Sequence, residues 1–413
     1  YDMSEIYVLG GAQTDFAKNY CRNNLGIYEL FRDIVLEGLE NTGLEPHEIE
    51  VGHVGNFVGE MFTGQGMLGG FFGHVHPDFA GMPSGRHEAA CASGSIAALS
   101  AMADIEAGRY NLACVVGLEY MRNMPGDKAA EYLGAAAWVG QEAEGARYVW
   151  PAMFHTVAQE YDRRYGLKRE HLKRISQNNF ANAKRNPLAQ TRNWAFTEDS
   201  FAEDDEANPV IEGWMRKSDC GQVTDGAAVV FLANRVTAEA YAARHDLTLE
   251  DLAQIRGWGH TTAPMRLDTK LQAAQPGEYL MPHVRKAITD AYDRAGITGP
   301  DDIDGIELHD CFSITEYMLI EHFGLGAPGE AWKAIEAGDI EMGGRLPVNP
   351  SGGLIGLGHP VGATGVRMLF DAARQVTGKA GAMQVDNAKN FATFNVGGSG
   401  TTSVSFIVGQ AGQ

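Results

Sequence analysis

Short apolar runs rich in β-branched residues alternate with helical patterns along most of this sequence. Six runs have the length and composition of buried strands, at residues 6–9, 52–58, 112–117, 227–232, 305–308 and 402–408. Helical patterns separate several of these runs. Because this alternation is typical of folds in which helices cover a sheet, the sequence predicts a layered α/β protein.

Charge and cysteine content restrict the partners of such a protein. The 413 residues include 53 acidic and 33 basic side chains, and a formal charge of -20 disfavours binding to nucleic acid or to an anionic membrane. No window approaches the roughly 18 to 20 continuous apolar residues of a membrane span. Five cysteines are too few, and odd in number, for a disulfide framework, and no signal peptide pattern opens the chain. We therefore expect a cytoplasmic protein without a membrane span or a nucleic-acid partner.

Two segments share one pattern, in which a candidate strand leads into an unusual turn and then a helix. The first turn holds Cys91, and a helix rich in small residues follows it. The second is His309-Asp310-Cys311-Phe312, followed by Ser313 and Glu316, which have the spacing of a capping box. This repetition indicates two related units. Residues 124–217 break the strand and helix alternation, and we interpret them as an inserted, largely helical region.

The insertion carries a basic run inside an acidic protein. Between positions 163 and 192 it has only one acid, Glu170, and nine basic residues: Arg163, Arg164, Lys168, Arg169, Lys173, Arg174, Lys184, Arg185 and Arg192. One interpretation is a solvated helical face. The other is a site for the phosphates of a small ligand.

Cys91 is the first candidate for chemistry. Small residues flank it and would let a substrate approach closely, and a thiolate at a helix amino terminus is favoured by the free amides and the helix dipole. The alternative is a small core residue, since free cysteine is often buried. That alternative applies with more force to Cys114, Cys21 and Cys220.

Three further segments could carry chemistry. The glycine-rich loop 349–365 contains His359, which Pro360 keeps out of helical geometry, and it leads into a helix expected from about residue 364 to 376. Its spacing fits neither a dinucleotide fingerprint nor a phosphate loop. His309 and Cys311 follow a candidate strand, where α/β folds place ligands. The glycine turn 395–400 is either a sharp bend or a source of amides for an oxyanion. No cysteine spacing predicts a zinc site.

Taken together and in this order, the four segments resemble the thiolase family, and within it the thiolases related to sterol carrier protein-x. The resemblance implies two similar five-stranded halves in an α/β/α/β/α arrangement, with a loop domain inserted in the first half. It divides the chain into a first half at 1–123 and 218–250, an inserted domain at 124–217 and a second half at 251–413. It also implies coenzyme A and acyl-CoA as binding partners, a homodimer or homotetramer, and no metal or other cofactor.

The resemblance also implies roles for single residues. Cys91 matches the acylated nucleophile and His359 the histidine that activates it. His309 matches the residue that holds a thioester oxygen together with His359. The amides of Cys91 and Gly397 match a second oxyanion hole. The basic run falls where relatives hold coenzyme A, and the candidate phosphate patch comprises Arg163, Arg164, Lys168, Arg169, Lys184 and Arg185.

One position departs from the pattern of most thiolases. Where they carry a second cysteine, at the start of the last glycine turn, this sequence has Asn395, which cannot act as a base. Cys311 supplies a thiol that could enter the same cavity, as in the sterol-carrier-type subgroup. The resemblance thus implies an acyltransferase that cleaves 3-oxoacyl-CoA, or runs the reverse Claisen condensation, through an acyl-cysteine. The alternatives are a retro-aldolase or other carbon-carbon bond enzyme acting on acyl-CoA, and a weakly catalytic acyl-CoA-binding subunit.

Overall fold

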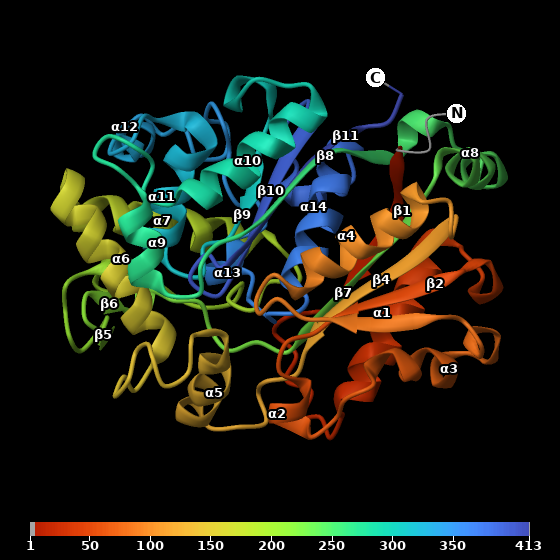
Figure 1. Cartoon of the computed structure of the whole chain (residues 1–413), viewed down its shortest axis with the longest axis horizontal. Helices are drawn as coiled ribbons and strands as arrows, with labels where there is room; N and C mark the ends of the chain where they lie inside the picture. The colour runs from red at the N-terminus through yellow and green to blue at the C-terminus, as the bar shows by residue number, and fades with distance from the viewer. Residues whose placement is uncertain (1–4, 413) are drawn as a thin grey trace.

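A mixed nine-stranded sheet runs through the molecule in the computed structural model, which describes residues 5–412 (Figure 1). Its strand order is β3-β2-β4-β7-β1-β8-β11-β10-β9. The first half of the chain provides β1 (Ile6–Gln13), β2 (Val51–Gly55), β3 (Ser84–His87), β4 (Leu112–Glu119) and β7 (Gly226–Ala233). The second half provides β8 (Ala253–Thr262), β9 (Ile306–Leu308), β10 (Asn390–Gly397) and β11 (Thr402–Gln410). The two sets join where the first residues of β1 pair antiparallel with β8. The predicted α/β class is confirmed.

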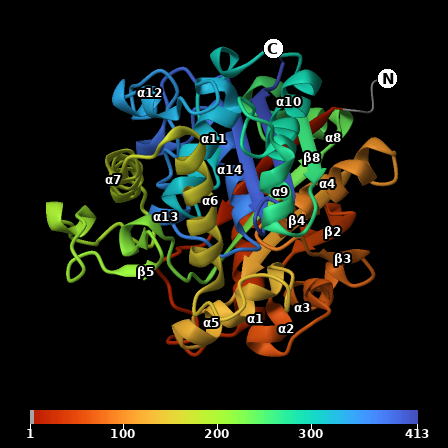
Figure 2. The ribbon, with the colours of Figure 1, turned by 60° about the vertical axis from the view of Figure 1, so that its left-hand side comes forward.

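Helices form three layers around the two sets of strands. Between the sets lie the central helices α4 (Ser93–Glu106) and α14 (Thr364–Val376), and α14 contacts both β7 and β10 (Figures 1 and 2). The outer faces are covered by α1 (Ile27–Thr42) on β1 and β7, and by α10 (Pro282–Ala295) on β8 and β11. Three buried apolar clusters fill the spaces between these layers. This is the predicted α/β/α/β/α layering.

Local sequence signals set several helix ends. α1 and α10 stop at Gly43 and Gly296, whose left-handed φ angles of 69° and 71° are readily adopted only by glycine. α10 also starts with Pro282, whose missing N–H costs nothing at a first helical position. The predicted helix from 364 to 376 corresponds to α14.

All six predicted strands are present, but the second half differs from the expected five strands. It has four, and where a fifth would lie beside β9 the structure has only an isolated parallel bridge between Ile306 and Val348. The sequence analysis missed β3, β8 and β10. The inward positions of β8 include Gly257 and Gly259, where a Cβ would collide with the backbone of α10. Because this close packing requires glycine, β8 lacks the alternating apolar residues by which a strand is predicted.

Residues 124–217 contain three α-helices joined by long irregular segments, and they pack against the second half of the chain. They form α5 (Gly126–Leu133), α6 (Val149–Tyr165), α7 (Arg169–Arg185) and a hairpin of β5 (Val210–Glu212) and β6 (Met215–Arg216). Both α6 and α7 contact α11 (Ser313–Ile320), and Phe154 and Phe312 lie with ring centroids 4.9 Å apart.

The other helices of the described chain are shorter or lie at the periphery: α2 (Gly59–Thr63), α3 (Phe72–Val75), α8 (Arg235–Arg244), α9 (Leu267–Ala273), α12 (Ala331–Glu336) and α13 (Gly353–Gly356). Within residues 5–412, no helix combines the length and the apolar character needed to cross a membrane.

Candidate functional site

A cavity of about 410 Å³ lies where the two halves and the inserted helices meet. Cys91, His309, Cys311 and His359 all line it, so the structure brings together four predicted residues from distant parts of the chain. Apolar side chains form most of the remaining wall, including Phe57, Met121, Leu133, Trp150, Phe154 and Ile211. A site of this kind surrounds a small number of polar groups with a mostly apolar wall.

Cys91 sits in a tight turn between β3 and α4. The preceding residue, Ala90, has a left-handed φ of 52°, and α4 begins at Ser93. Ser93 fixes the turn, because its Oγ accepts the Ala89 N–H at 3.0 Å and donates to the Ala90 carbonyl at 2.5 Å. Burial and the Glu119 carboxylate raise the pKa of Cys91 to about 12, although the Gly398 N–H donates to its sulfur. The resting group is therefore a thiol that needs a base.

His359 has the properties of that base. Its backbone N–H donates to Thr224 Oγ1 at 3.0 Å, and its Nδ1 lies 2.6 Å from Thr364 Oγ1. The Thr364 hydroxyl donates to the Pro360 carbonyl at 3.4 Å, which leaves its oxygen to accept Nδ1–H. Nε2 is buried without a protein partner and carries the lone pair. Burial and Arg367 lower the pKa of His359 to about 3, so the imidazole is neutral at physiological pH.

His309 presents the opposite tautomer to the cavity. Its Nδ1 accepts hydrogen bonds from the Val396 N–H at 3.3 Å and from Asn395 Nδ2 at 3.1 Å. Since a backbone N–H can only donate, Nδ1 is unprotonated and Nε2 carries the hydrogen. Burial, His359 and Arg367 hold the pKa of His309 well below its usual value. His309 is therefore a neutral hydrogen-bond donor.

The sulfur and the two rings form one compact group. The imidazole centroids of His309 and His359 are 5.0 Å apart and nearly perpendicular, and one ligand atom from each of Cys91, His309 and His359 lies within 4.8 Å of the others. This spacing would also suit a soft metal ion, and no other group of three such side chains is found within residues 5–412. For acyl transfer it brings a nucleophile, a base and a donor to one point.

Asn395 joins the two halves at this point. Its Nδ2 donates to the Cys91 carbonyl at 3.0 Å as well as to His309, and its Oδ1 accepts the Ser95 hydroxyl at 2.7 Å. Nearby, a Cβ on Gly397 would collide with the Ala89 carbonyl, so only glycine lets the end of β10 approach the Cys91 turn this closely. Asn395 therefore orients His309 and links it to the Cys91 turn.

Cys311 borders the same cavity, beside Cys220. Its sulfur lies 3.4 Å from Thr315 Oγ1, and the Gly221 N–H donates to its carbonyl at 3.2 Å. Burial, opposed by the Thr315 hydroxyl, raises the pKa of Cys311. Cys220, which we interpreted as a core residue, lines the cavity but donates to the Arg216 carbonyl at 3.2 Å. Cys311 is thus the thiol with the freer sulfur.

The predicted capping box after this turn is wrong. Ser313 instead donates to Asp219 at 2.6 Å. Glu316 accepts hydrogen bonds from Asn179 at 2.9 Å and Asn349 at 2.8 Å. Both side chains are buried, Ser313 against Asp219 and Glu316 against helix α7 and the glycine loop, and these tertiary partners are present in place of a local helix cap.

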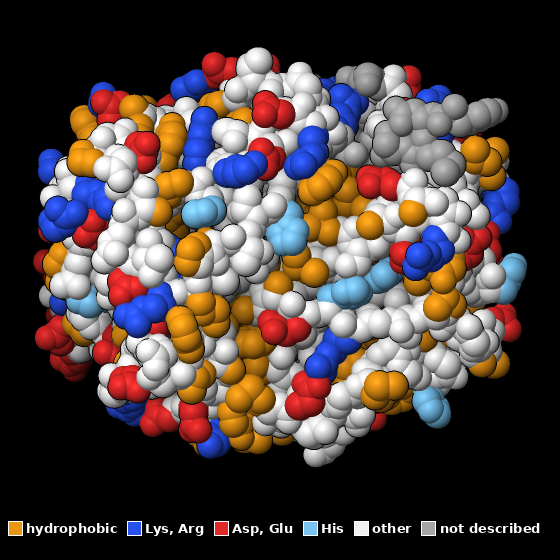
Figure 3. Space-filling view, viewed as in Figure 1, with side chains coloured by type: hydrophobic (Ala, Val, Ile, Leu, Met, Phe, Trp, Pro, Cys, Tyr) orange, Lys and Arg blue, Asp and Glu red, His pale blue; other side chains and the backbone are white. Residues whose placement is uncertain are grey.

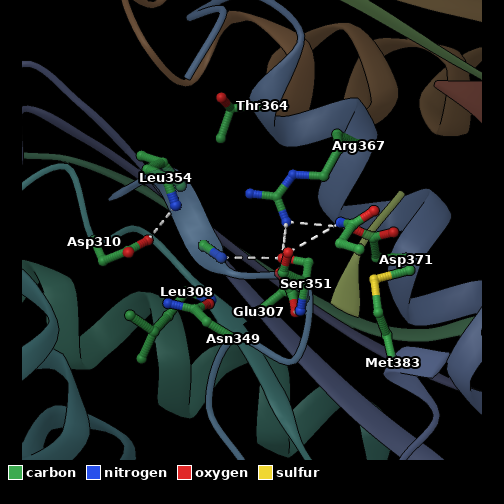
Figure 4. A network of polar contacts seen from close by, with 12 residues as sticks. Glu307, Leu308, Asp310, Asn349, Ser351, Leu354, Thr364, Arg367, Asp371 and Met383 are labelled. Atoms are coloured by element: carbon green, nitrogen blue, oxygen red, sulfur yellow. Dashed lines mark hydrogen bonds and ion pairs between the residues drawn. The ribbon is translucent and has the colours of Figure 1, made fainter. Parts of the chain in front are cut away.

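A buried network of charged and polar side chains lies beside the start of the glycine-rich loop that carries His359 (Figure 4). Arg367 is fully buried on α14 and donates to Glu307 at 2.5 Å and to Ser351 and Asp371 at 3.2 Å each. Asp310 accepts the Leu354 N–H at 2.6 Å, which ties the His309 turn to the same loop. Buried charges are tolerated when they are paired. Glu307 and Asp371 both pair with Arg367 through its Nη1, while its Nε and Nη2 are buried without a hydrogen-bond partner.

The predicted phosphate patch does not lie at the cavity as one surface. Arg163 and Arg164 pair with Glu160 at 2.6 and 2.7 Å, and Arg169 pairs with Asp219 at 2.5 Å. On the left of the space-filling view, where Figure 1 shows α6 and α7, basic and acidic side chains are interspersed (Figure 3). None of the six predicted residues lines the cavity around Cys91.

The cation that does line the cavity is Lys217, which the sequence analysis missed. Lys217 also borders an adjoining smaller cavity walled by Phe180, Trp194 and Phe196. Lys184, a member of the predicted patch, lies with its Nζ 5.6 Å from the centroid of Phe196. Positive charge near the cavities therefore comes from two lysines on different elements.

Two family models match nearly the whole chain. The model described as thiolase, N-terminal domain, matches residues 6–236, and the model described as thiolase C-terminal domain-like matches residues 267–410. The chain belongs to the thiolase family. It is an enzyme of the acyltransferase class.

Individual relatives of this thiolase agree with that assignment. An acetyl-CoA acetyltransferase of Methanothermobacter thermautotrophicus is 31% identical over 98% of this chain and 99% of its own length. Human sterol carrier protein 2 is 28% identical over 98% of this chain and 72% of its own length. Among solved structures, the Ltp2-ChsH2(DUF35) aldolase has a TM-score of 0.77 at 23% identity, covering 99% of both chains. Human mitochondrial 3-ketoacyl-CoA thiolase in complex with CoA has a TM-score of 0.70 at 16% identity, again covering 99% of both chains. At these identities the two structures show a shared fold.

Several residues that shape the site of this thiolase gave little signal in the sequence. Thr364 and Ser95 are ordinary hydroxyl residues in helical segments, and Glu119 closes a strand. Glu119 is buried and accepts the Phe57 and Val58 N–H groups at 3.1 and 2.8 Å, which holds the loop after β2 beside Cys91. Asn395 was singled out from the sequence as a departure from most thiolases, but its contacts with Ser95, Cys91 and His309 were not predicted.

Proposed function

We propose that this thiolase transfers acyl groups between acyl-CoA and acetyl-CoA, by thiolytic cleavage of a 3-oxoacyl-CoA or by the reverse Claisen condensation. The observation that carries the proposal is the spacing of the Cys91 sulfur and the imidazole nitrogens of His309 and His359, within 4.8 Å of one another in an apolar cavity. Their protonation states are matched, since a protonated thiol faces a neutral imidazole.

In the acylation step, His359 Nε2 takes the thiol proton as the Cys91 sulfur attacks the 3-keto carbon. The oxygen of that carbon becomes an oxyanion, and the amides of Cys91 and Gly397 stabilise it. When the carbonyl reforms, the bond between C2 and C3 breaks and the acyl group stays on sulfur as a thioester. The electrons of that bond remain on C2 of the departing acetyl-CoA.

Two histidine donors, neutral His309 and the His359 imidazolium, serve the departing acetyl-CoA carbanion. The thioester oxygen, which takes up the negative charge as an enolate, accepts hydrogen bonds from His309 Nε2–H and from His359, now protonated on Nε2. Cys311 delivers a proton to C2 and recovers one in the reverse direction. The Cys311 thiolate then takes a proton from His359, which becomes neutral again. His359 deprotonates free coenzyme A, whose sulfur attacks the acyl-cysteine, and Cys91 leaves as a thiolate that takes this proton back from His359 as the shortened acyl-CoA is released.

Coenzyme A would enter across the inserted region. The lysines Lys217 and Lys184 supply positive charge for its phosphates, while the apolar wall formed by Trp150 and Phe154 suits an acyl chain. The relatives named as acetyl-CoA acetyltransferases support acetyl-CoA as one of the two substrates.

Intact-mass measurement after incubation with acetyl-CoA tests the proposal. We expect an added acetyl group on the wild type and none on Cys91→Ala, with the adduct mapped to Cys91 by peptide analysis. Cleavage of a 3-hydroxyacyl-CoA without any covalent adduct would instead support a retro-aldolase. Tight acyl-CoA binding with neither adduct nor turnover would support a binding subunit.

A further inference from the structure

One buried cation lies next to the catalytic turn without a role in the chemistry described above. Lys270, on α9, is 2% exposed. Its Nζ donates to the Ser399 hydroxyl at 2.6 Å, the Thr401 hydroxyl at 2.7 Å and the Met265 carbonyl at 2.9 Å. None of these acceptors is a carboxylate. The Glu142 carboxylate acts on the Lys270 ammonium without a hydrogen bond to it, and burial outweighs this attraction and lowers the pKa of Lys270 to about 8. Burying a lysine without a hydrogen-bonded counter-charge is costly, and an apolar residue of the same length would avoid that cost.

Two of the three hydrogen bonds, those to Ser399 and Thr401, converge on the terminal glycine turn between β10 and β11. Gly398 and Gly400 in this turn have left-handed φ angles of 65° and 86°. Glycines leave a backbone with many accessible conformations, so such a turn is held in place only by what surrounds it. Ser399 and Thr401 are the residues of the turn that follow these glycines, and Lys270 bonds the side chains of both.

The position of this turn determines what reaches the nucleophile. The Gly398 N–H donates to the Cys91 sulfur and lowers its pKa relative to burial alone. The adjacent Gly397 amide is the donor assigned above to the acyl oxyanion. A displacement of about 1 Å in such donors is enough to cost a large factor in rate.

A second set of contacts holds the start of α9, the helix that carries Lys270. Glu142, in the inserted region, accepts the Leu267 N–H at the start of α9 at 2.6 Å and the Trp138 N–H at 2.9 Å. The Ala136 carbonyl of the same segment lies close to Gly398. The inserted region, α9 and the glycine turn therefore meet around one lysine.

We propose that Lys270 is a positioning residue that holds the terminal glycine turn so that its amides point at the Cys91 sulfur and at the acyl oxygen. The inference rests on the proposed function for the oxyanion, but its effect on the Cys91 thiol is independent of any substrate. Lys270 touches neither substrate nor reacting atoms, and it acts through Ser399 and Thr401.

The test compares Lys270→Met with Lys286→Met, an exposed lysine on α10 that pairs with Asp290. We expect Lys270→Met to slow alkylation of Cys91 by iodoacetamide about tenfold at pH 8 and to move the alkylation midpoint to higher pH. In thiolysis, kcat should fall by roughly 10- to 100-fold with KM changed less than about threefold, as for a donor that acts in the transition state. Lys286→Met should match the wild type in alkylation rate, alkylation midpoint, kcat and KM.

Ser399→Ala provides a milder variant that keeps the lysine and removes one acceptor. It should slow alkylation less than Lys270→Met, and the double variant should be no slower than Lys270→Met alone, because both changes act through one contact. Alkylation and kcat in folded Lys270→Met within twofold of the wild type, or fully additive effects in the double variant, would overturn the proposal. Failure of the proposed function would look different, since the wild type itself would then form no acyl adduct while alkylation still reported on the turn.

Discussion

The two central helices lie side by side between the two sets of strands, yet they bring different chemistry to the cavity (Figure 1). α4 begins two residues after Cys91 and buries small apolar side chains such as Ala97, Ala98 and Ala101. α14 begins five residues after His359 and buries a charged arginine, Arg367. The helices approach closely through glycine, since a Cβ on Gly365 would collide with the Ser95 hydroxyl of α4.

In the proposed mechanism, this difference makes Cys91 the group that gives up a proton and His359 the group that accepts it. Near α4 the Cys91 sulfur has no cation beside it, so burial and Glu119 keep it protonated. Near α14 the positive charge of Arg367 adds to burial and keeps His309 and His359 neutral. A duplicated architecture thus acquires two opposite electrostatic environments from the residues inside its central helices.

Removing the thiol from the α4 side should have the largest effect. Cys91→Ala should lose the acyl adduct and reduce thiolysis by at least about 10³-fold, because no second group in the cavity replaces the nucleophile. Intact mass and steady-state kinetics measure the two effects. Cys114→Ala, a buried cysteine in β4 away from the cavity, serves as the control and should keep the adduct. An adduct that persists on another residue in Cys91→Ala would contradict the assignment.

Replacing His359, the proposed base next to α14, should have the second-largest effect. His359→Ala should slow acylation by roughly 10²- to 10⁴-fold, which is typical of a positioned acid or base. In the wild type, acylation should persist as the pH falls to about 5, because with its pKa lowered to about 3 His359 is still unprotonated there. Rapid-quench measurement of adduct formation across pH tests both points, with exposed His47→Ala as the control. An acylation rate that halves near pH 6.5 would show a histidine of ordinary pKa.

The second thiol can be separated from the first. Cys311→Ala should still acylate Cys91, but condensation and exchange of the acetyl methyl protons with solvent should fall by about 10²-fold or more, because both need a base near that carbon. Deuterium wash-in to acetyl-CoA measures the exchange. Cys220→Ala, which removes the neighbouring thiol of the same cavity, is the matched control and should exchange normally. Normal wash-in for Cys311→Ala would assign the proton transfer to another group.

The buried Arg367 of α14 should contribute to the free energy of unfolding. Arg367→Met leaves the Glu307 and Asp371 carboxylates buried beside an apolar side chain and should lower the free energy of unfolding by about 3 to 5 kcal/mol. Arg374→Met removes a partner of the same Asp371 from a side chain that is 21% exposed, and should cost about 1 kcal/mol or less. Equilibrium unfolding in urea compares them, and equal losses would mean that burial of the arginine does not matter.

The smallest effect should come from the inserted region. Replacing Lys184 and Lys217 with glutamine should raise KM for CoA substrates by about two- to tenfold, with little change in kcat, because distant phosphates contribute uniform binding. The difference should shrink in high salt. Arg163→Gln is the control, since Arg163 is exposed and paired with Glu160, and a larger effect from Arg163 would restore the patch predicted from the sequence.

Local signals in the sequence were sufficient for much of the fold and for the candidate residues. The six predicted strands and the helix Thr364–Val376 follow from apolar patterning and from glycine and proline positions, which act over a few residues. Cys91, His359 and the His309 turn could be singled out for the same reason, because tight turns demand unusual residues at fixed spacing. The capping box at Ser313 failed because local spacing competes with tertiary partners that sequence reasoning does not include.

The sequence by itself thus determined the α/β class, the thiolase resemblance and which side chains to suspect. Only the tertiary structure decided their states and partners. The Asn395 contact with Cys91 spans 304 positions of the chain and the Lys270 contact with Ser399 spans 129, so neither leaves a trace in local spacing. Whether arginines such as Arg163 and Arg169 are free for a phosphate depended on Glu160 and Asp219. Tautomers, pKa values and free charges are set by neighbours in space, which folding brings together from distant parts of the chain.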